Sequence, residues 1–368
     1  MNPISSDLLA VRSWRGFLAR INRKLNSLLK FTRRAGNNLY VLSPLFLPFQ
    51  GNPALDWVNN TLLKFQLKIL MSFLGIKRPL LWIENVRAAD FIGSFNWQLV
   101  VYHVSDLFTE CPYTHNKARL KDREAYISNH SDLVLCVSQQ LYQSKQNLKA
   151  QVSYAPHGVD FEHFRKAVEN RKVSTRLSQD HHPIAGYFGT LTAQNDIELL
   201  QYCAANLKDV TFVFAGRITA GDYSKLTKMT NVIFLGQLPY EEIPTLCATF
   251  DVCLLPWKMN EWIAHCNPLK LQEYMASGKP IVSVAIREVV DKYSGIISIA
   301  HNKEQFAEAI CWELQNDTPE RSRKRIEIAK NHSWDKHVEK ISELIENAIT
   351  SKQSGRFHLA SQSLGEIS

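Results

Sequence analysis

The chain has 368 residues, which is long enough for two domains that each bury a core of their own. Hydrophobic residues make up 45% and charged residues 21% of it, a balance typical of soluble globular proteins. The formal net charge of +8 indicates an anionic partner, and charge alone leaves open nucleic acid, an acidic membrane surface and a phosphorylated ligand.

The number and spacing of the cysteines indicate the redox compartment in which the protein works. The cysteines are dispersed, without a CxxC pair, and are Cys111, Cys136, Cys203, Cys247, Cys253, Cys266 and Cys311. An odd, dispersed set argues against a disulfide framework or a zinc site and favours a reducing, cytoplasmic compartment. We expect no signal peptide and no membrane span, because the longest apolar stretch, Leu62 to Leu74, contains Lys64 and Lys68 and reads as an amphipathic helix.

The first segment, residues 1–36, is basic and amphipathic. It contains a single acidic residue, Asp7, and these basic residues: Arg12, Arg15, Arg20, Arg23, Lys24, Lys30, Arg33 and Arg34. Leu18, Ile21, Leu25 and Leu28 recur between them at helical spacing. Two interpretations stay open: a solvated helix packed on the following domain, or a peripheral surface that rests on anionic lipid.

From residue 37 onward, short apolar runs alternate with helical stretches. The runs are Leu39–Leu42, Leu80–Ile83, Leu99–Tyr102, Leu133–Val137 and Val152–Ala155, then Ile184–Phe188, Val210–Phe214, Val232–Leu235, Val252–Leu255, Ile281–Val284 and Ile296–Ile299. Continuous Val/Ile/Leu runs are typical of parallel strands covered on both faces, and their alternation with helices predicts an α/β, doubly wound architecture. We predict two Rossmann-like domains at 37–165 and 184–332, a polar linker at 166–183, a helix at 333–350 that crosses back to the first domain, and a disordered tail at 351–368.

The segment from Asn267 to Pro280 carries the start and stop signals of one helix. Asn267 suits the N-cap, Pro268 suits the first helical position, and Gly278 suits the left-handed residue after the helix. Leu271 and Met275, four residues apart, should face the core.

Lys270 is the unusual member of this helix. It places a cation in the first turn, where the helix dipole is already positive, at a cost of about 0.3 kcal/mol or more. This indicates a bound anion that meets both the lysine and the helix amides. The alternative is an exposed lysine that points to water or pairs with Glu273.

These residues resemble the donor-binding helix of the group 1 (family four) retaining glycosyltransferases of GT-B fold. The signature of that family is a glutamate, seven residues, a second glutamate, and then a small residue, Gly, any residue and Pro before a strand. Other segments similar to the family are Phe250–Pro256, Val232–Gly236 with Pro239–Glu242, the hinge Pro156–Asp160 with Phe164, and Ser131–Val134 with Val137 and Ser138. Gly186–Gly189, followed by an acid, is similar to the exopolysaccharide and teichuronic-acid subgroup.

The resemblance implies a set of donor contacts. Glu273 would bind the donor ribose and Lys270 the diphosphate, joined by the backbone amides of Cys266 and Asn267. His265 stands where the family has its first glutamate, so the identity of the transferred sugar stays open. Glu261, just before this loop, is a second candidate to bind the hydroxyl groups of the donor sugar.

Two further residues, both in loops, are candidates to contact the phosphates of the donor. Thr190 stands where many members of the family carry a phosphate-binding arginine. Arg217 either supplies that missing cation or is a solvated loop arginine.

On the acceptor side, the run that ends at Tyr102 is followed by His103 and, three residues later, Asp106, at the end of a strand where α/β folds place their sites. Asp106 matches the aspartate of the family's His-Asp pair and is the first candidate for a catalytic polar group. His103 is the second candidate, with a satisfied core histidine as the alternative. His157 and Gly158 would line the hinge and the cleft.

The family opens with a strand and a Gly-rich loop, and residues 1–36 show neither pattern. Two interpretations stay open: the start of the chain is assigned too late, or the first domain lacks that unit.

The resemblance implies a hexosyltransferase that transfers a sugar with retention and without a metal ion. The donor would be a UDP- or GDP-sugar, used as substrate with no cofactor, and the acceptor a glycan or a polyprenyl-linked sugar in cell-surface polysaccharide synthesis. No nucleic-acid motif accompanies the basic residues. Two other hypotheses stay open: a catalytically silent nucleotide-sugar-binding relative, motivated by His265 and Thr190, and a sugar-nucleotide epimerase of the same fold.

Overall fold

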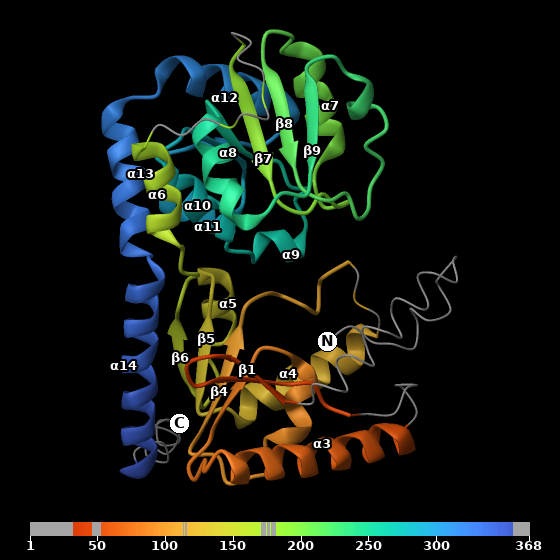
Figure 1. Ribbon diagram of the computed structural model, residues 1–368, viewed down its shortest axis with the longest axis vertical. Coiled ribbons are helices and arrows are strands. Elements are labelled where there is room, and N and C mark those ends of the chain that lie inside the picture. The colour runs from red at the N-terminus through yellow and green to blue at the C-terminus, as the bar shows by residue number, and fades with distance from the viewer. Residues whose placement is uncertain are drawn as a thin grey trace, which may run out of the picture. The chain divides into compact units, whose positions relative to one another are not determined.

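The computed structural model describes residues 32–45, 53–112, 114, 116–170, 174, 177 and 182–355 (Figure 1). The chain divides into two units, Met1–Leu81 with Arg87–Gln98, and Trp82–Val86 with Leu99–Ser368. Most of the basic segment 1–36 and most of the tail 351–368 lie outside the described residues. The domain boundaries drawn from the sequence stay predictions.

The first unit contains a hairpin and a long helix. Strands β1 (Thr32–Gly36) and β2 (Leu39–Leu42) pair antiparallel, and helix α3 (Pro53–Phe73) follows them. The prediction that Leu39–Leu42 is a strand covered on both faces was wrong, because Leu39 and Tyr40 are exposed in the hairpin. No helix among the described residues is long and apolar enough to span a bilayer.

The second unit begins with the sheet that we call the N-terminal sheet. Its strands are β3 (Leu80–Ile83, of which Trp82 and Ile83 belong to this unit), β4 (Leu99–Val104), β5 (Leu133–Cys136) and β6 (Gln151–Tyr154), in that order. The pairs β4–β5 and β5–β6 are parallel. Helix α4 (Lys117–His130) connects β4 to β5, and helix α5 (Gln139–Ser144) connects β5 to β6. The short 3₁₀ helix η1 (Val86–Phe91) belongs to the first unit from Arg87 onward.

The sheet that we call the C-terminal sheet has six strands. They are β7 (Ile184–Phe188), β8 (Thr211–Ala215), β9 (Val232–Gly236), β10 (Val252–Leu255), β11 (Ile281–Val284) and β12 (Ser298–Ala300). All are parallel, in the order β12-β11-β10-β7-β8-β9. This is the strand order of a doubly wound Rossmann sheet, whose ligands bind at the carboxyl ends of the strands where the order reverses, here between β7 and β10. The predicted parallel α/β architecture is confirmed.

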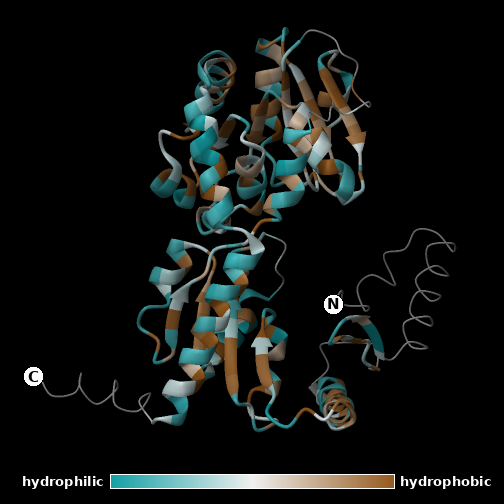
Figure 2. Ribbon diagram, turned by 60° about the vertical axis from the view of Figure 1, so that its left-hand side comes forward, coloured by the Kyte–Doolittle hydropathy of each residue, from teal (hydrophilic) through white to brown (hydrophobic). Residues whose placement is uncertain are grey.

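Helices cover both faces of the C-terminal sheet (Figure 1). Helices α7 (Ile197–Asn206) and α12 (Lys303–Asn316) pack together on one face. Helices α6 (Phe161–Glu169), α8 (Ile243–Thr249), α10 (Leu269–Ser277) and α13 (Pro319–Asn331) pack together on the other. The remaining helices are α9 (Glu261–Ala264) and α11 (Arg287–Tyr293), with 3₁₀ turns at Leu226–Lys228 and Tyr240–Glu242. Hydrophobic residues concentrate on the strands, between these layers (Figure 2).

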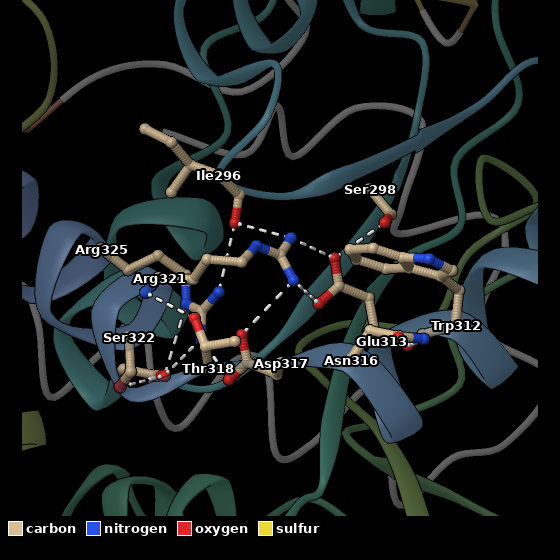
Figure 3. Close-up of polar contacts among 11 residues, drawn as sticks. Ile296, Ser298, Trp312, Glu313, Asn316, Asp317, Thr318, Arg321, Ser322 and Arg325 are labelled. Atoms are coloured by element: carbon tan, nitrogen blue, oxygen red, sulfur yellow. Dashed lines mark hydrogen bonds and ion pairs between the residues drawn. The ribbon is translucent and has the colours of Figure 1, made fainter.

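A buried ion pair fixes the end of α10. Arg325 of α13 is fully buried and donates from Nη2 to the carbonyl oxygen of Gly278 at 2.9 Å and to Asp317 Oδ2 at 2.7 Å (Figure 3). Ser322 Oγ donates to the same Gly278 oxygen at 2.8 Å. Gly278 ends α10 with a φ of 72°, the left-handed conformation predicted for it. The carbonyl oxygen of Gly278, just after the helix end, therefore accepts from a charged donor, which ties the end of α10 to α13.

The last helix, α14 (Trp334–Gln353), contacts the N-terminal sheet. Lys340 Nζ donates to the Tyr154 carbonyl oxygen at 3.2 Å, and Lys352 Nζ lies 2.6 Å from Asp132 Oδ2. The helix runs through Gln353, so residues 351–353 are helical rather than part of the disordered tail that we predicted. The start of α14 lies beside the hinge: Val159 and Ser333 form a parallel bridge, and a Cβ added to Gly158 would lie 2.6 Å from the Trp334 ring.

Candidate functional site

The reversal point of the C-terminal sheet is where the predicted phosphate-binding residues meet. Gly189 follows β7 with a φ of +126°, a conformation that residues with a side chain rarely adopt. A Cβ there would lie 2.6 Å from Lys270 Nζ. The loop after β7 therefore comes close to the end of the Lys270 side chain, and its backbone conformation favours glycine.

Lys270 points across the end of β7. Its Nζ lies 5.3 Å from the Tyr187 ring centroid and 5.9 Å from that of Phe188. It forms no ion pair with any carboxylate among the described residues. The alternative of a lysine paired with Glu273 is therefore not what the structure shows, and a half-buried ammonium remains for an anion to meet.

Thr190 and Arg217 lie at the same edge. They follow the neighbouring strands β7 and β8, and both are exposed. The Leu191 amide donates to the Arg217 carbonyl oxygen at 3.0 Å, which holds the two loops together. The fold thus brings Thr190, Arg217 and Lys270 to one edge of the sheet.

Asn267 has a different role from the one we predicted. Helix α10 begins at Leu269 with Pro268 as its N-cap, and no side chain caps it. Asn267 is buried, and its Nδ2 donates to the Val137 carbonyl oxygen at 2.8 Å. The predicted N-cap was therefore wrong: the Asn267 side chain joins the loop before α10 to the end of β5.

Glu273 lies one turn into α10 and has no hydrogen-bond partner among the described residues. Burial raises the pKa of its carboxyl to about 7, and the nearby charge of Lys270 opposes that shift. Burial, with the charge of Glu273, also raises the pKa of Tyr240 to about 12, so the tyrosine lies near this carboxylate. A half-buried acid without a protein partner is suited to accept hydrogen bonds from a ligand's hydroxyl groups.

The loop before α10 holds the predicted sugar-binding residues. His265 Nδ1 lies 2.9 Å from the Glu261 carbonyl oxygen and 3.5 Å from Glu261 Oε1. The Cys266 amide donates to the Ile263 carbonyl oxygen at 3.0 Å, so this amide, which we expected to contact the donor, is used within the turn. Burial raises the pKa of the Cys266 thiol, which keeps it protonated. His265 and Glu261 are brought together, one half-buried and one exposed.

Asp106 reaches this same loop. Trp262 Nε1 donates a hydrogen bond to Asp106 Oδ1, and the Leu107 amide donates to that oxygen at 3.1 Å. Burial raises the pKa of Asp106 to about 6, although both hydrogen bonds favour the ionised form. The structure therefore joins the first catalytic candidate, at the end of β4, to the helix that precedes the predicted donor site.

His103 lies in a different environment. Its Nδ1 is 3.1 Å from Glu84 Oε1, its ring lies 5.4 Å from that of Trp82, and its Nε2 is buried without a partner among the described residues. Burial, with the charges of His103 and His337, lowers the pKa of His157 to about 4. His103 thus belongs with His157 and His337 near the hinge, and its contacts do not include Asp106 or the loop before α10.

Sequence reasoning missed the residues that link the two sheets. Ser138 Oγ donates to the His265 carbonyl oxygen at 2.6 Å. Glu288 of α11 is fully buried and accepts from the Gln139 amide and from the Tyr154 hydroxyl, both at 2.7 Å. For Ser138, the family-like residues Val137 and Ser138 at the end of β5 were a signal that this position matters. Glu288 gave no such signal, because in the sequence it looks like any glutamate on a helix surface.

All cysteines are free thiols. Within the described residues, no group of three or more His, Cys, Asp or Glu side chains is arranged to hold a metal ion.

Comparisons with known proteins agree with this geometry. Residues 182–316 match the family model described as glycosyl transferases group 1. TuaH of Bacillus subtilis strain 168, whose name assigns it to teichuronic acid biosynthesis as a glycosyltransferase, is 26% identical over 205 residues, and the match covers 51% of this chain and 51% of TuaH. The match therefore spans about half the length of that relative.

Solved structures show the same fold. Sucrose-phosphate synthase from Thermosynechococcus elongatus is similar with a TM-score of 0.66 and 14% identity, over 90% of this chain and 93% of that one. HepE of Anabaena, solved in complex with UDP and glucose, is similar with a TM-score of 0.61 and 15% identity, over 82% and 84%. The chain has the GT-B fold, and its residues 182–316 match the model of the group 1 glycosyl transferases.

Proposed function

We propose that this protein transfers a sugar from a nucleoside diphosphate sugar, with UDP or GDP as the nucleotide, to a hydroxyl of a glycan or polyprenyl-linked acceptor in cell-surface polysaccharide synthesis. The observation that carries the proposal is Lys270. Its ammonium group lies without a carboxylate partner among the described residues, beside Gly189 at the reversal point of a doubly wound sheet. That is where such sheets bind nucleotides.

The charges of the site suit this reaction. As the bond between the sugar and the diphosphate breaks, negative charge accumulates on the leaving phosphate. Lys270 and the first amides of α10 supply positive charge at that position, so we propose that the transfer needs no metal ion. Glu273, one turn along the helix, would accept hydrogen bonds from the ribose hydroxyls.

We further propose that the transfer retains the anomeric configuration. The acceptor oxygen bonds to the anomeric carbon as the phosphate oxygen leaves, and the leaving phosphate takes the acceptor proton. In that scheme no carboxylate has to form a covalent intermediate. Asp106, bonded to Trp262 beside the predicted donor loop, would accept a hydrogen bond from the acceptor hydroxyl and orient it.

The names of the relatives support the donor and pathway classes. HepE was solved with UDP and glucose, and TuaH is named for teichuronic acid biosynthesis. Because polyprenyl-linked acceptors are membrane-bound, we propose that the enzyme works at the cytoplasmic face of the membrane. The segment predicted to contact lipid, residues 1–36, lies mostly outside the described residues.

Calorimetric titration with UDP and GDP tests the donor site. Lys270→Ala should raise the Kd of the preferred nucleotide at least about tenfold, or about 1.4 kcal/mol. The matched control is Lys303→Ala, an exposed lysine at the start of α12, which should leave the Kd unchanged. Equal affinity of wild type and Lys270→Ala, or no binding of either nucleotide, would contradict the proposal.

A further inference from the structure

Helix α3 carries an exposed apolar face that the proposed transfer reaction does not use. Trp57 is 69% exposed, Phe65 61%, Ile69 51% and Phe73 84%. Phe65, Ile69 and Phe73, spaced four apart, form a stripe along the exposed side of the helix, and Trp57 lies two turns before them, beyond the polar Thr61. Ile76 extends it just beyond the last turn and is also exposed.

The opposite side of α3 is fixed to its own unit. Gln66 is buried, its Oε1 accepts from the Leu45 amide at 2.8 Å, and its Nε2 donates to the Leu45 carbonyl oxygen at 2.9 Å. Asn60 Nδ2 donates to Asp90 Oδ2 at 2.9 Å. These contacts hold the inner side of the helix, so the stripe stays turned outward.

Basic residues flank the stripe. Lys64 and Lys68 lie on the helix between Trp57 and Phe73, and Lys77 and Arg78 follow its end. The one acid in residues 53–81 is Asp56, which already has an interaction partner. The surface thus combines large apolar side chains with a local excess of positive charge.

This combination selects the partner. A second copy of the chain would bring the same positive charge against it, which is unfavourable. An anionic bilayer accepts both features, because aromatic and aliphatic side chains enter the boundary between headgroups and acyl chains while lysines reach the lipid phosphates. Helix α3 is not apolar enough to cross the bilayer, so it would lie in the plane of the membrane.

We infer that the outward face of α3, made of Trp57, Phe65, Ile69, Phe73 and Ile76 with Lys64, Lys68, Lys77 and Arg78, docks this protein on anionic lipid. The inference is independent of the donor site, since none of these residues belongs to the unit that contains Lys270.

Co-sedimentation of the full chain with vesicles tests the inference. The probes are vesicles of phosphatidylcholine alone and vesicles in which part of it is replaced by phosphatidylglycerol. The wild-type chain should bind the anionic vesicles more tightly, and added salt should weaken that binding. Phe73→Ser and Lys68→Glu should each lower the affinity for anionic vesicles by about tenfold.

The matched control is Val338→Ser, which removes another exposed apolar side chain, on α14. It should bind vesicles like the wild type, and all variants should keep the wild-type affinity for UDP or GDP. Wild-type binding by Phe73→Ser would overturn the inference. So would a concentration-dependent dimer that Phe73→Ser dissociates in the absence of vesicles, because the face would then be an interface between two copies.

Discussion

The indole N–H of Trp262 donates a hydrogen bond to Asp106 Oδ1 and joins the end of β4 to α9. Asp106 lies just after β4 of the N-terminal sheet, and Trp262 belongs to α9, which precedes α10. The contact joins the part of the chain that we expect to hold the acceptor to the part that we expect to hold the donor. It also gives the half-buried Asp106 carboxylate a hydrogen-bond donor.

Replacement of Asp106 by Asn should separate its effect on stability from its effect on activity. Because burial raises the pKa of Asp106 to about 6 from 3.8, the protonated form favours the folded state, and this contribution is lost as the pH rises through about 6. Asp106→Asn should therefore melt a few degrees higher than the wild type at pH 8, with the difference shrinking toward pH 4. Transfer activity at pH 8 should fall. A variant with full activity would remove Asp106 from the site.

Glu273→Gln tests the ribose contact. Burial raises the pKa of this carboxyl to about 7, so the ionised form is unfavourable to folding above that pH and the glutamine should not lower the stability at pH 8. The affinity of the wild type for UDP or GDP should fall between pH 8 and pH 6, as the carboxylate takes up a proton. The affinity of the variant should be about tenfold weaker at pH 8, and it should change less between pH 8 and pH 6 than that of the wild type, because only the ligand phosphate then titrates. Titration at both pH values checks this, and a large drop in the melting temperature would instead mark Glu273 as structural.

Glu288→Ala should destabilise the link between the two sheets. The substitution leaves the Gln139 amide and the Tyr154 hydroxyl without their acceptor and leaves Lys292, 2.7 Å from Glu288 Oε1, without its ion pair. Removal of one partner of a buried charged network costs about 3 kcal/mol or more. Denaturant unfolding measures the loss against Glu304→Ala, an exposed acid of α12 that should change little. Equal stabilities would mean that the link contributes nothing.

The strands were predictable because their signal is local. The runs at Ile184–Phe188, Val252–Leu255 and Ile281–Val284 are strands with those bounds in the structure. Each is a continuous apolar run, as a parallel strand between two helical layers requires. Leu39–Leu42 has the same local pattern and forms an exposed hairpin, because a short apolar run does not determine what covers it.

The site was predictable only where helix geometry and the family motif agreed. Lys270 and Glu273 could be placed because a single helix carries both. Asn267 could not, because its partner, the Val137 carbonyl, is 130 residues away in the sequence and competes successfully with the local cap. The same holds for Glu288, whose partners at Gln139 and Tyr154 are set by the tertiary fold alone.

The paired hinge limits how the two sheets can move. The chain passes between them beside Val159 and again at Ser333, and these two passages are hydrogen-bonded to each other, with Trp334 seated on Gly158. Two separate connections would allow the sheets to twist and slide against each other. Because the two connections are hydrogen-bonded together, they act as one pivot. A rotation of the sheets about this pivot would leave groups beside it, such as His157, among their present neighbours, and it would have to break the contact between Asp106 and Trp262.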